Sequence, residues 1–299
     1  MTQNIPKELD KFRKAGEIAA KALHFGLDLI EPGASHLEVS CAVEAEIARL
    51  GGEPAFPAQI SLNNIAAHYC ARPDDPLVFR DGDLAKLDVG VHIDGYVGDN
   101  AGSKDLGGHA LLVEASRQAL NSAIRLAGPG QPIRELSRAI QSTINSMGFK
   151  PVSNLTGHAV GHYQVHGPPQ IPNVPDFRAG SLRSGMVVAI EPFASDGRGV
   201  VHNKGRAEIF SAKKRLRLKS TMNSEIFDAI VNYNGLPFGR RNLTDRFARE
   251  DVDQTLREML RGGMLYDYPP LAEPPGTFLS QAEHTIYVGE RVEILTLAD

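Results

Sequence analysis

The sequence predicts an α+β fold built on antiparallel hairpins, with a mainly helical block inserted near its C-terminal end. Helical patterns come in pairs, so the regular strand–helix alternation of a doubly wound parallel sheet is absent. Two strand-like runs, 84–93 and 96–101, are joined by Asp94-Gly95, a dipeptide typical of tight hairpins. A charged, helical stretch over 208–268 separates strand-bearing sequence on its two sides.

The composition is that of a globular protein of one large or two ordinary domains. Of 299 residues, 42% are hydrophobic and 23% charged, and the net charge of −4 gives no indication of nucleic acid or an anionic membrane as partner. No stretch has the roughly 18 apolar residues of a membrane span, and the N-terminus lacks a signal-peptide core. Two cysteines, Cys41 and Cys70, are too few for a disulfide framework, so we expect a cytoplasmic protein whose metals, if any, bind oxygen and imidazole.

The N-terminal half contains four predicted helices. The turn Glu31-Pro32-Gly33 ends the first, Ser35 is a candidate N-cap for the second, and Gly51-Gly52 ends it. The predicted helices span 8–30, 36–50, 109–127 and 133–147, and the predicted strands 57–62, 84–93 and 96–101.

The two pairs of helices have a similar sequence pattern, which we call the sequence echo. The order helix, EPGAS, helix, GG near 14–52 is similar to helix, GPGQP, helix, MG near 111–148. Strand-rich sequence follows each pair. On pattern alone, a duplicated α/β half and a chance similarity between common turns explain the echo equally well.

The C-terminal half changes character twice. Short strands and Gly/Pro-rich loops cover 152–202, the charged helical block follows, and strand character returns at 282–297. We therefore expect one domain formed by 1–207 with 269–299, and an inserted helical subdomain at 208–268.

Five acidic and histidine side chains lie in apolar strand-like or turn sequence. They are Asp88 (KLDVG), Asp99 (YVGDNAG), His158 (LTGHAVGH), Glu191 (VVAIEPFA) and Glu283 (QAEHTIYV). A charge buried among apolar residues is costly unless it is paired. Together the five would form an oxygen and nitrogen cage for two divalent ions such as Mn, Fe, Co or Zn. Two ions about 3.5–4 Å apart can activate water and stabilise a tetrahedral intermediate, which suits amide hydrolysis.

Each of these residues also has an ordinary structural interpretation. Asp99 could cap a turn, Asp88 could end a strand, and a lone glutamate at a strand end is usually solvated. His158, His162 and His166 are spaced by four, as in a helical zinc site, but the nearby glycines and β-branched residues favour an extended path. We therefore expect His162 at the surface or behind the ligands.

Several motifs together carry a resemblance to a known family. They run from residue 12 to nearly the C-terminus, and the order and spacing of the set are specific. In this order they resemble the methionine aminopeptidases of type II, in the compact archaeal form without a long N-terminal extension. The motifs are Pro54-Ala55-Phe56-Pro57, SLNNIAAHY from Ser61 to Tyr69, KLDVG from Lys86, HIDGY from His92, Gly157-His158, IEPF from Ile190, and Glu283-His284-Thr285.

The resemblance implies a pita-bread fold, in which two pseudo-symmetric halves surround an antiparallel sheet, with a winged-helix-like insertion. It implies that Asp88 binds one metal, that His158 and Glu191 bind the other, and that Asp99 and Glu283 bridge both. Glu191 would also accept the proton of the attacking water. His68 and His166 would flank the scissile peptide, and Phe56 would line an apolar pocket for the methionine side chain. Cys70, two residues beyond His68, would lie near the entrance of the site and could be modified there.

The activity that the resemblance implies is removal of the initiator methionine from nascent chains whose next residue is small. A monomer is expected, and the ribosome is a candidate partner. The basic run 213–219 is interpreted as a solvated face rather than a nucleic-acid site. Two alternatives are a non-catalytic interaction protein on the same fold, against which the filled ligand positions argue, and a prolidase- or creatinase-type enzyme, which carries a large additional N-terminal domain.

Overall fold

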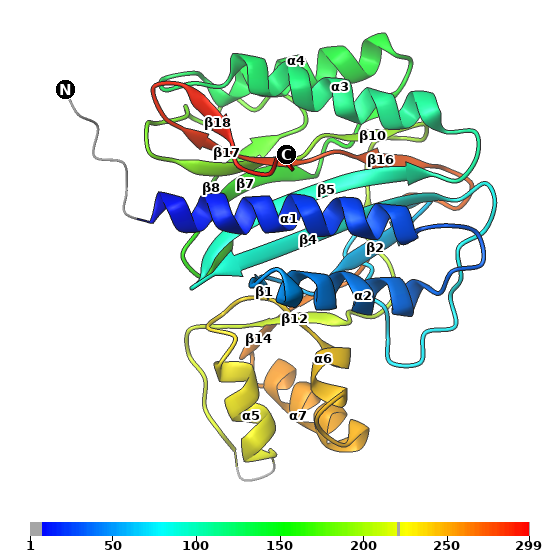
Figure 1. Cartoon of the computed structure of the whole chain (residues 1–299), viewed down its shortest axis with the longest axis vertical. Coiled ribbons are helices and arrows are strands. Elements are labelled where there is room, and N and C mark those ends of the chain that lie inside the picture. The colour runs from blue at the N-terminus through cyan, green and yellow to red at the C-terminus, as the bar shows by residue number, and fades with distance from the viewer. Residues whose placement is uncertain (1–7, 220–221, 299) are drawn as a thin grey trace.

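Two pairs of helices cover a central layer of antiparallel strands, and a smaller group of helices and strands lies beyond one edge of that layer (Figure 1). The computed structural model describes residues 8–219 and 222–298, so the first seven residues of the expected larger domain lie outside it. The four predicted helices of the N-terminal half are present within one or two residues of their expected ends. The helices are α1 (Leu9–Leu29), α2 (His36–Arg49), α3 (Ala110–Leu126), α4 (Ile133–Ser146), α5 (Ser224–Val231), α6 (Arg240–Thr244) and α7 (Arg249–Arg261).

The first half of the central layer is built on a long hairpin. Asp94 and Gly95 both have positive φ, 49° and 83°, as a tight two-residue turn of the primed type requires. The second arm is longer than expected, because the small polar run after Ala101 stays paired as far as Asp105. The strands of this half are β1 (Glu53–Pro54), β2 (Gln59–Leu62), β3 (Ile65–Ala67), β4 (Leu84–Ile93) and β5 (Tyr96–Asp105).

The second half contains a five-stranded antiparallel sheet in the order β18-β17-β9-β7-β8. The hydroxyl of Thr285 joins it to the first half, since it donates to the carbonyl of Asp99 over 2.7 Å and accepts from the Asp99 N–H over 2.9 Å. The strands are β6 (Lys150–Pro151), β7 (Thr156–Gly161), β8 (Gln164–Pro172), β9 (Val187–Ile190), β10 (Phe193–Ser195), β16 (Leu279–Gln281), β17 (His284–Val288) and β18 (Val292–Ile294).

The sequence echo between the halves corresponds to matching structure. In each half a glycine with positive φ stands in the interhelical turn, Gly33 at 91° and Gly130 at 83°. In each half an isolated antiparallel bridge forms just before the second helix, at Ser35 in one case and at Pro132 in the other. The Ser35 side chain also caps α2, accepting a hydrogen bond from the Glu38 N–H. The two helix pairs therefore share the geometry of their turns.

Helix α1 lies unusually close to the strand layer. A Cβ added to Gly98 of β5 would stand 2.6 Å from the backbone nitrogen of Gly16, and one added to Gly16 would stand 2.3 Å from the Leu295 carbonyl oxygen. Only glycine permits both approaches. The buried faces of α1 and α2 pack with β2 and β4 around one apolar core, while α3 and α4 cover a second one.

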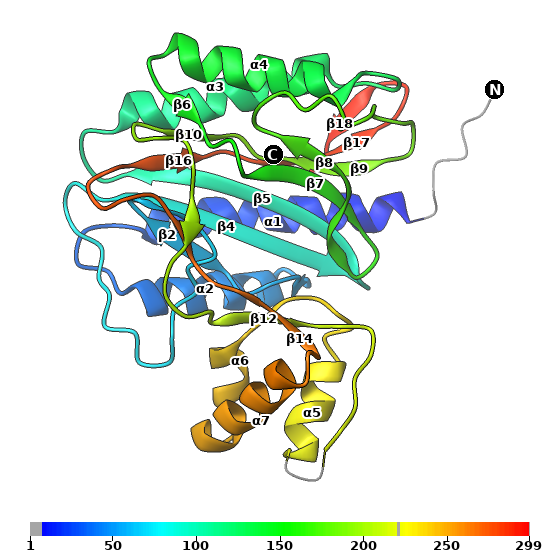
Figure 2. The ribbon, with the colours of Figure 1, turned by 180° about the vertical axis from the view of Figure 1, so that it is seen from behind.

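The segment 208–268, which is predicted to be an insertion, begins and ends at neighbouring points of the structure. Strand β11 (His202–Asn203) pairs antiparallel with β15 (Leu271–Ala272), so the chain between them begins and ends side by side. Figure 2 shows this segment next to α2, on the side away from α3 and α4. It has its own apolar cluster, which includes Phe210, Ile226 and Met259.

The segment predicted to be a helical, winged-helix-like insertion contains strands as well as helices. Besides α5, α6 and α7, the segment contains a three-stranded antiparallel sheet of order β13-β12-β14, formed by β13 (Phe238–Gly239), β12 (Ile209–Ala212) and β14 (Leu265–Tyr268). Two of these strands lie at the ends of the segment. The charged residues after Ala212 concealed the short buried run Ile209-Phe210, which is too short to carry a strand pattern of its own. Among the described residues, no helix is long and apolar enough to cross a membrane.

Candidate metal centre

The hairpin β4–β5 presents two carboxylates on one face. Asp88 lies opposite Ala101 and Asp99 lies opposite Gly90, and directly paired residues of antiparallel strands point to the same side. Asp88 and Asp99 are therefore diagonal neighbours on the face that looks toward the second half. Gly90 leaves room on this face for the ring of Phe56, which a Cβ would meet at 2.2 Å.

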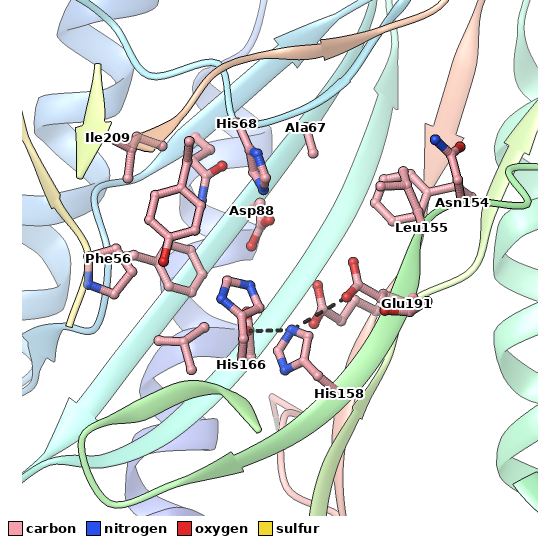
Figure 3. A pocket seen from close by; sticks show the side chains of 18 residues that line it. Phe56, Ala67, His68, Asp88, Asn154, Leu155, His158, His166, Glu191 and Ile209 are labelled. Atoms are coloured by element: carbon pink, nitrogen blue, oxygen red, sulfur yellow. Dashed lines mark ion pairs between the residues drawn. The ribbon is translucent and has the colours of Figure 1, made fainter. Parts of the chain in front are cut away.

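The second half supplies the other three residues from adjacent strands. His158 on β7 is paired with Ala189 of β9, Glu191 follows the last residue of β9, and Glu283 directly precedes β17. The His158 Nε2 atom lies 3.4 Å from Glu191 Oε1 and 3.9 Å from Asp99 Oδ2 (Figure 3). Ligand atoms of Asp99, His158 and Glu283 lie within 4.8 Å of one another. All five predicted residues line one cavity.

A nearby positive charge would stabilise the carboxylates of this cluster in their ionised form. Burial raises the pKa of Asp88 to about 7. Burial, and then the neighbouring carboxylates, raise the pKa of Asp99, Glu191 and Glu283 well above their usual range. Burial, with a smaller effect of His166, lowers the pKa of His158 to about 3.

Several buried polar atoms of the cluster also lack a hydrogen-bond partner. Among the described residues these include Asp88 Oδ1, Asp99 Oδ1, His158 Nδ1 and Glu283 Oε1. Buried polar groups are normally satisfied, so a set of unpartnered carboxylate oxygens that converge with an imidazole is the arrangement of a cation-binding site. The donor set, oxygen with one nitrogen and no sulfur, fits a hard or borderline divalent metal.

Two further histidines stand over the same cavity. His68 follows β3 with a φ of 66°, a conformation that is rare outside glycine and is often found at functional sites. The ring of His166 on β8 lies 4.6 Å from that of His158, and the Tyr268 ring lies 5.7 Å from His68 and 6.1 Å from His166. Burial, then His166, lowers the pKa of His68 to about 4. The surrounding protein also lowers the pKa of His166, although its side chain is open to solvent on one side, so both rings are neutral near pH 7.

Beside the charged cluster the cavity is apolar. Its volume is about 190 Å³, and its walls include Phe56, Leu155 and Phe193. The inserted segment contributes Ile209, Pro237 and Tyr268. Sequence reasoning missed these three because each is an apolar or aromatic residue in a stretch without a motif. It also missed Gln281, whose side-chain amide donates to Glu283 Oε2 over 3.3 Å; the spacing of two residues along a strand could have indicated it.

A buried ion-pair network fixes the inserted segment against this cavity. Glu44 of α2 accepts hydrogen bonds from both terminal nitrogens of Arg241 on α6 and from the backbone N–H of Ala58 over 2.9 Å. The Asn242 amide adds a bond of 3.2 Å. Ala58 lies two residues beyond Phe56, so the network holds the loop that forms one wall of the cavity.

The structure places His162 and Cys70 away from the cavity floor. His162 is exposed in the turn between β7 and β8, where its ring lies 4.7 Å from that of Tyr96, so the extended path predicted for the three histidines is correct. Cys70 is 3% exposed, and burial raises its pKa to about 12. The expectation of a modifiable thiol at the entrance is therefore wrong: the side chain turns inward toward α6 and is neither accessible nor ionised.

Acidic residues and a histidine that converge between the two halves of this fold are the arrangement expected of a metallopeptidase. In agreement, metallopeptidase family M24 matches residues 10–236. The chain is 41% identical over 280 residues to the methionine aminopeptidase of Archaeoglobus fulgidus, covering 93% of this chain and 94% of the relative. It is 42% identical over 296 residues to the methionine aminopeptidase of Methanocaldococcus jannaschii, covering 96% of this chain and 98% of that relative. The chain belongs to the methionine aminopeptidases of this family.

Solved structures agree on the fold. A methionine aminopeptidase from Thermotoga maritima, 27% identical, superposes with a TM-score of 0.71 and coverage of 99% of both chains. A thermophilic Arx1, only 16% identical, superposes with a TM-score of 0.84 over 98% of this chain and 91% of that one, which shows a shared fold and nothing of function. The expected pita-bread fold, α+β with antiparallel sheets, is confirmed, as is the resemblance to the archaeal form of the enzyme.

Proposed function

We propose that this metallopeptidase removes N-terminal methionine with two divalent metal ions held by Asp88, Asp99, His158, Glu191 and Glu283. The observation that carries the proposal is the convergence of five ligand candidates beside an apolar cavity, three of them fully buried and four with a buried polar atom that lacks a partner. Asp88 would hold one ion, His158 and Glu191 would hold the other, and Asp99 and Glu283 would contact both. Co, Mn, Fe and Zn all suit this donor set.

The bound ions supply Lewis acidity and bring the pKa of a water molecule near neutrality. Glu191 then accepts the proton of the attacking water. Its position on the cavity wall beside His158 supports this role, because a general base must lie within reach of the proton that it accepts.

The two histidines over the cavity orient the peptide bond. A neutral imidazole can donate to the carbonyl oxygen from one nitrogen and exchange a proton with the leaving amine from the other. We assign His68 and His166 to these tasks. Their lowered pKa values support the assignment, since protonated rings would repel the metal ions and lose the acceptor nitrogen.

The apolar part of the cavity receives the methionine side chain. Phe56 offers the edge and face of an aromatic ring, with which a thioether sulfur makes favourable contact. The limited volume of about 190 Å³ supports a preference for one unbranched side chain at this position and a small residue after it.

We further infer the organisation around this site. Residues 1–207 with 269–299 form the catalytic domain, and 208–268 form an inserted, winged-helix-like subdomain whose Tyr268 and Pro237 complete the cavity. The protein acts as a monomer in the cytoplasm on nascent chains that begin with methionine, and the ribosome is a candidate partner. The paired strands at the borders of the insertion and its own apolar core support the division.

The test is cleavage of the peptide Met-Ala-Ser by purified protein. With added Co²⁺ or Mn²⁺ we expect methionine release, and with excess chelator none. The variants His158→Asn and His162→Asn form a matched pair, because the two histidines are four residues apart but only the first lines the cavity. We expect the first variant to lose activity and the second to keep it. Absence of metal-dependent cleavage by folded protein would exclude the proposal.

A further inference from the structure

Strand β14 has a free edge beside the candidate active site. It is the last strand in the order β13-β12-β14, so only one of its sides is paired among the described residues. We propose that the substrate main chain beyond its second residue binds along this edge as an added antiparallel strand. The proposal rests on the proposed function and extends it to the part of the substrate that is not cleaved.

The backbone groups on the free side of β14 can be identified from its pairing with β12. Lys213 donates to the carbonyl of Met264 over 2.8 Å, in the same register that pairs Ser211 with Tyr266 and Ile209 with Tyr268. Hydrogen bonding alternates along an antiparallel pair, so the groups of Leu265 and Asp267 point to the other side. An edge with such unpaired N–H and C=O groups readily accepts another extended chain.

This edge borders a groove that continues from the active-site cavity. The groove has a volume of about 1030 Å³, and His68, Thr156, His158, His166 and Tyr268 line both the groove and the cavity. Its opposite wall is β8, where Pro168 and Pro169 have no N–H to offer. β8 is also the last strand of its sheet, but with these prolines it offers fewer main-chain donors than β14, so we place the peptide on β14.

The direction of the bound chain follows from the order of residues on β14. Tyr268 lies at the cavity, and Asp267 and Tyr266 follow outward along the groove. A substrate whose first residue occupies the cavity must run from Tyr268 toward Leu265, which is antiparallel to β14. Tyr266 is 56% exposed, and the Lys213 ammonium stands 4.4 Å from its ring centre, so an aromatic surface is available to the substrate's side chains.

A second groove competes for the same part of the substrate. It has a volume of about 430 Å³ and is lined by Arg72, Lys204 and Arg206, but it shares only His68 with the cavity. Its basic side chains would favour acidic residues in the substrate. If the main chain pairs with β14 instead, kcat/KM should depend on the length of the peptide and little on its sequence.

The test compares Met-Ala with Met-Ala-Ser-Ala-Ala. We expect kcat/KM of the metal-loaded protein to be several-fold higher for the longer peptide. The variant Asp267→Pro removes only the outward N–H, since proline is tolerated on the free side of an edge strand. It should lower kcat/KM for the longer peptide by about three- to tenfold, the value of one hydrogen bond, and leave Met-Ala unchanged. The control Asp267→Ala, which keeps the N–H, should behave like the wild type.

Each other outcome contradicts the inference. Equal kcat/KM on the two peptides, or an equal loss on both in Asp267→Pro, would exclude pairing with β14. A loss confined to the longer peptide in Arg206→Ala, and absent in Asp267→Pro, would place the substrate in the basic groove. If the wild type cleaves neither peptide, the proposed function itself is refuted. This result differs from those that contradict only the pairing with β14.

Discussion

Replacing Asp88 by asparagine should stabilise the metal-free protein, although it removes a proposed ligand. Burial moves the pKa of Asp88 from 3.8 to about 7. Between these values the folded protein holds a proton that the unfolded chain has lost, so stability falls as pH rises through this window. About three pKa units at about 1.4 kcal/mol each give a cost of about 4 kcal/mol at pH 8. The Asp88→Asn variant avoids this cost because the asparagine side chain does not ionise. Its amide oxygen can still accept a hydrogen bond from Gln281.

The assay is urea unfolding of chelator-treated protein at pH 5 and pH 8. We expect the variant to exceed the wild type in free energy of unfolding by a few kcal/mol at pH 8 and by much less at pH 5. Added Mn²⁺ should reverse the order at pH 8, since only the wild type has the complete ligand set. Asp81→Asn, at an exposed carboxylate, is the control and should change neither value. A metal-free Asp88→Asn variant that is less stable than the wild type at pH 8 would show that the Asp88 carboxylate does not destabilise the metal-free fold.

Three further predictions concern the surroundings of the centre. Phe56→Ala should lower kcat/KM for Met-Ala-Ser about ten- to hundredfold, because the pocket loses its aromatic wall. Peptide kinetics check this, with Phe56→Leu as the control that should lose less of its kcat/KM. Arg241→Ala should reduce the free energy of unfolding by about 3–5 kcal/mol, since it leaves a buried glutamate unpaired, whereas Arg249→Ala, at an exposed pair, should cost less than about 1 kcal/mol. His68, with its pKa at about 4, should make the fold lose stability as pH falls from about 6.5 to 4, because only the unfolded chain takes up the proton there; His68→Asn should weaken that dependence in acid unfolding curves, and an unchanged slope would contradict it.

Local sequence signals determined much of the fold in advance. Asp94-Gly95 fixed the position and type of the central hairpin, and Gly33 and Ser35 marked the turn and the cap between the first two helices. These features depend on residues adjacent in the chain. The strands of the insertion, such as β12, were missed because their stability comes from pairing with β14 more than fifty residues later, which no local pattern records.

The candidate site, like the fold, could be predicted from local sequence only in part. The ligand candidates could be identified because charge in an apolar strand is unusual, as at Asp88 and Glu283. Their convergence could not be derived from the residues, since it depends on how β5 meets β17 through Thr285. The apolar wall from Ile209 and Tyr268 carried no signal, because such residues are common in any core.

We propose that the five side chains hold two metal ions with Asp99 as a bridge. Equilibrium dialysis of the purified protein against Mn²⁺ or Co²⁺, followed by elemental analysis of the wild type and of Asp99→Ala, measures the number of ions that each binds. We expect two ions per chain in the wild type, at most one in the variant, the same far-UV circular dichroism for both, and no cleavage of Met-Ala-Ser by the variant. Two ions and full activity in Asp99→Ala would contradict the account.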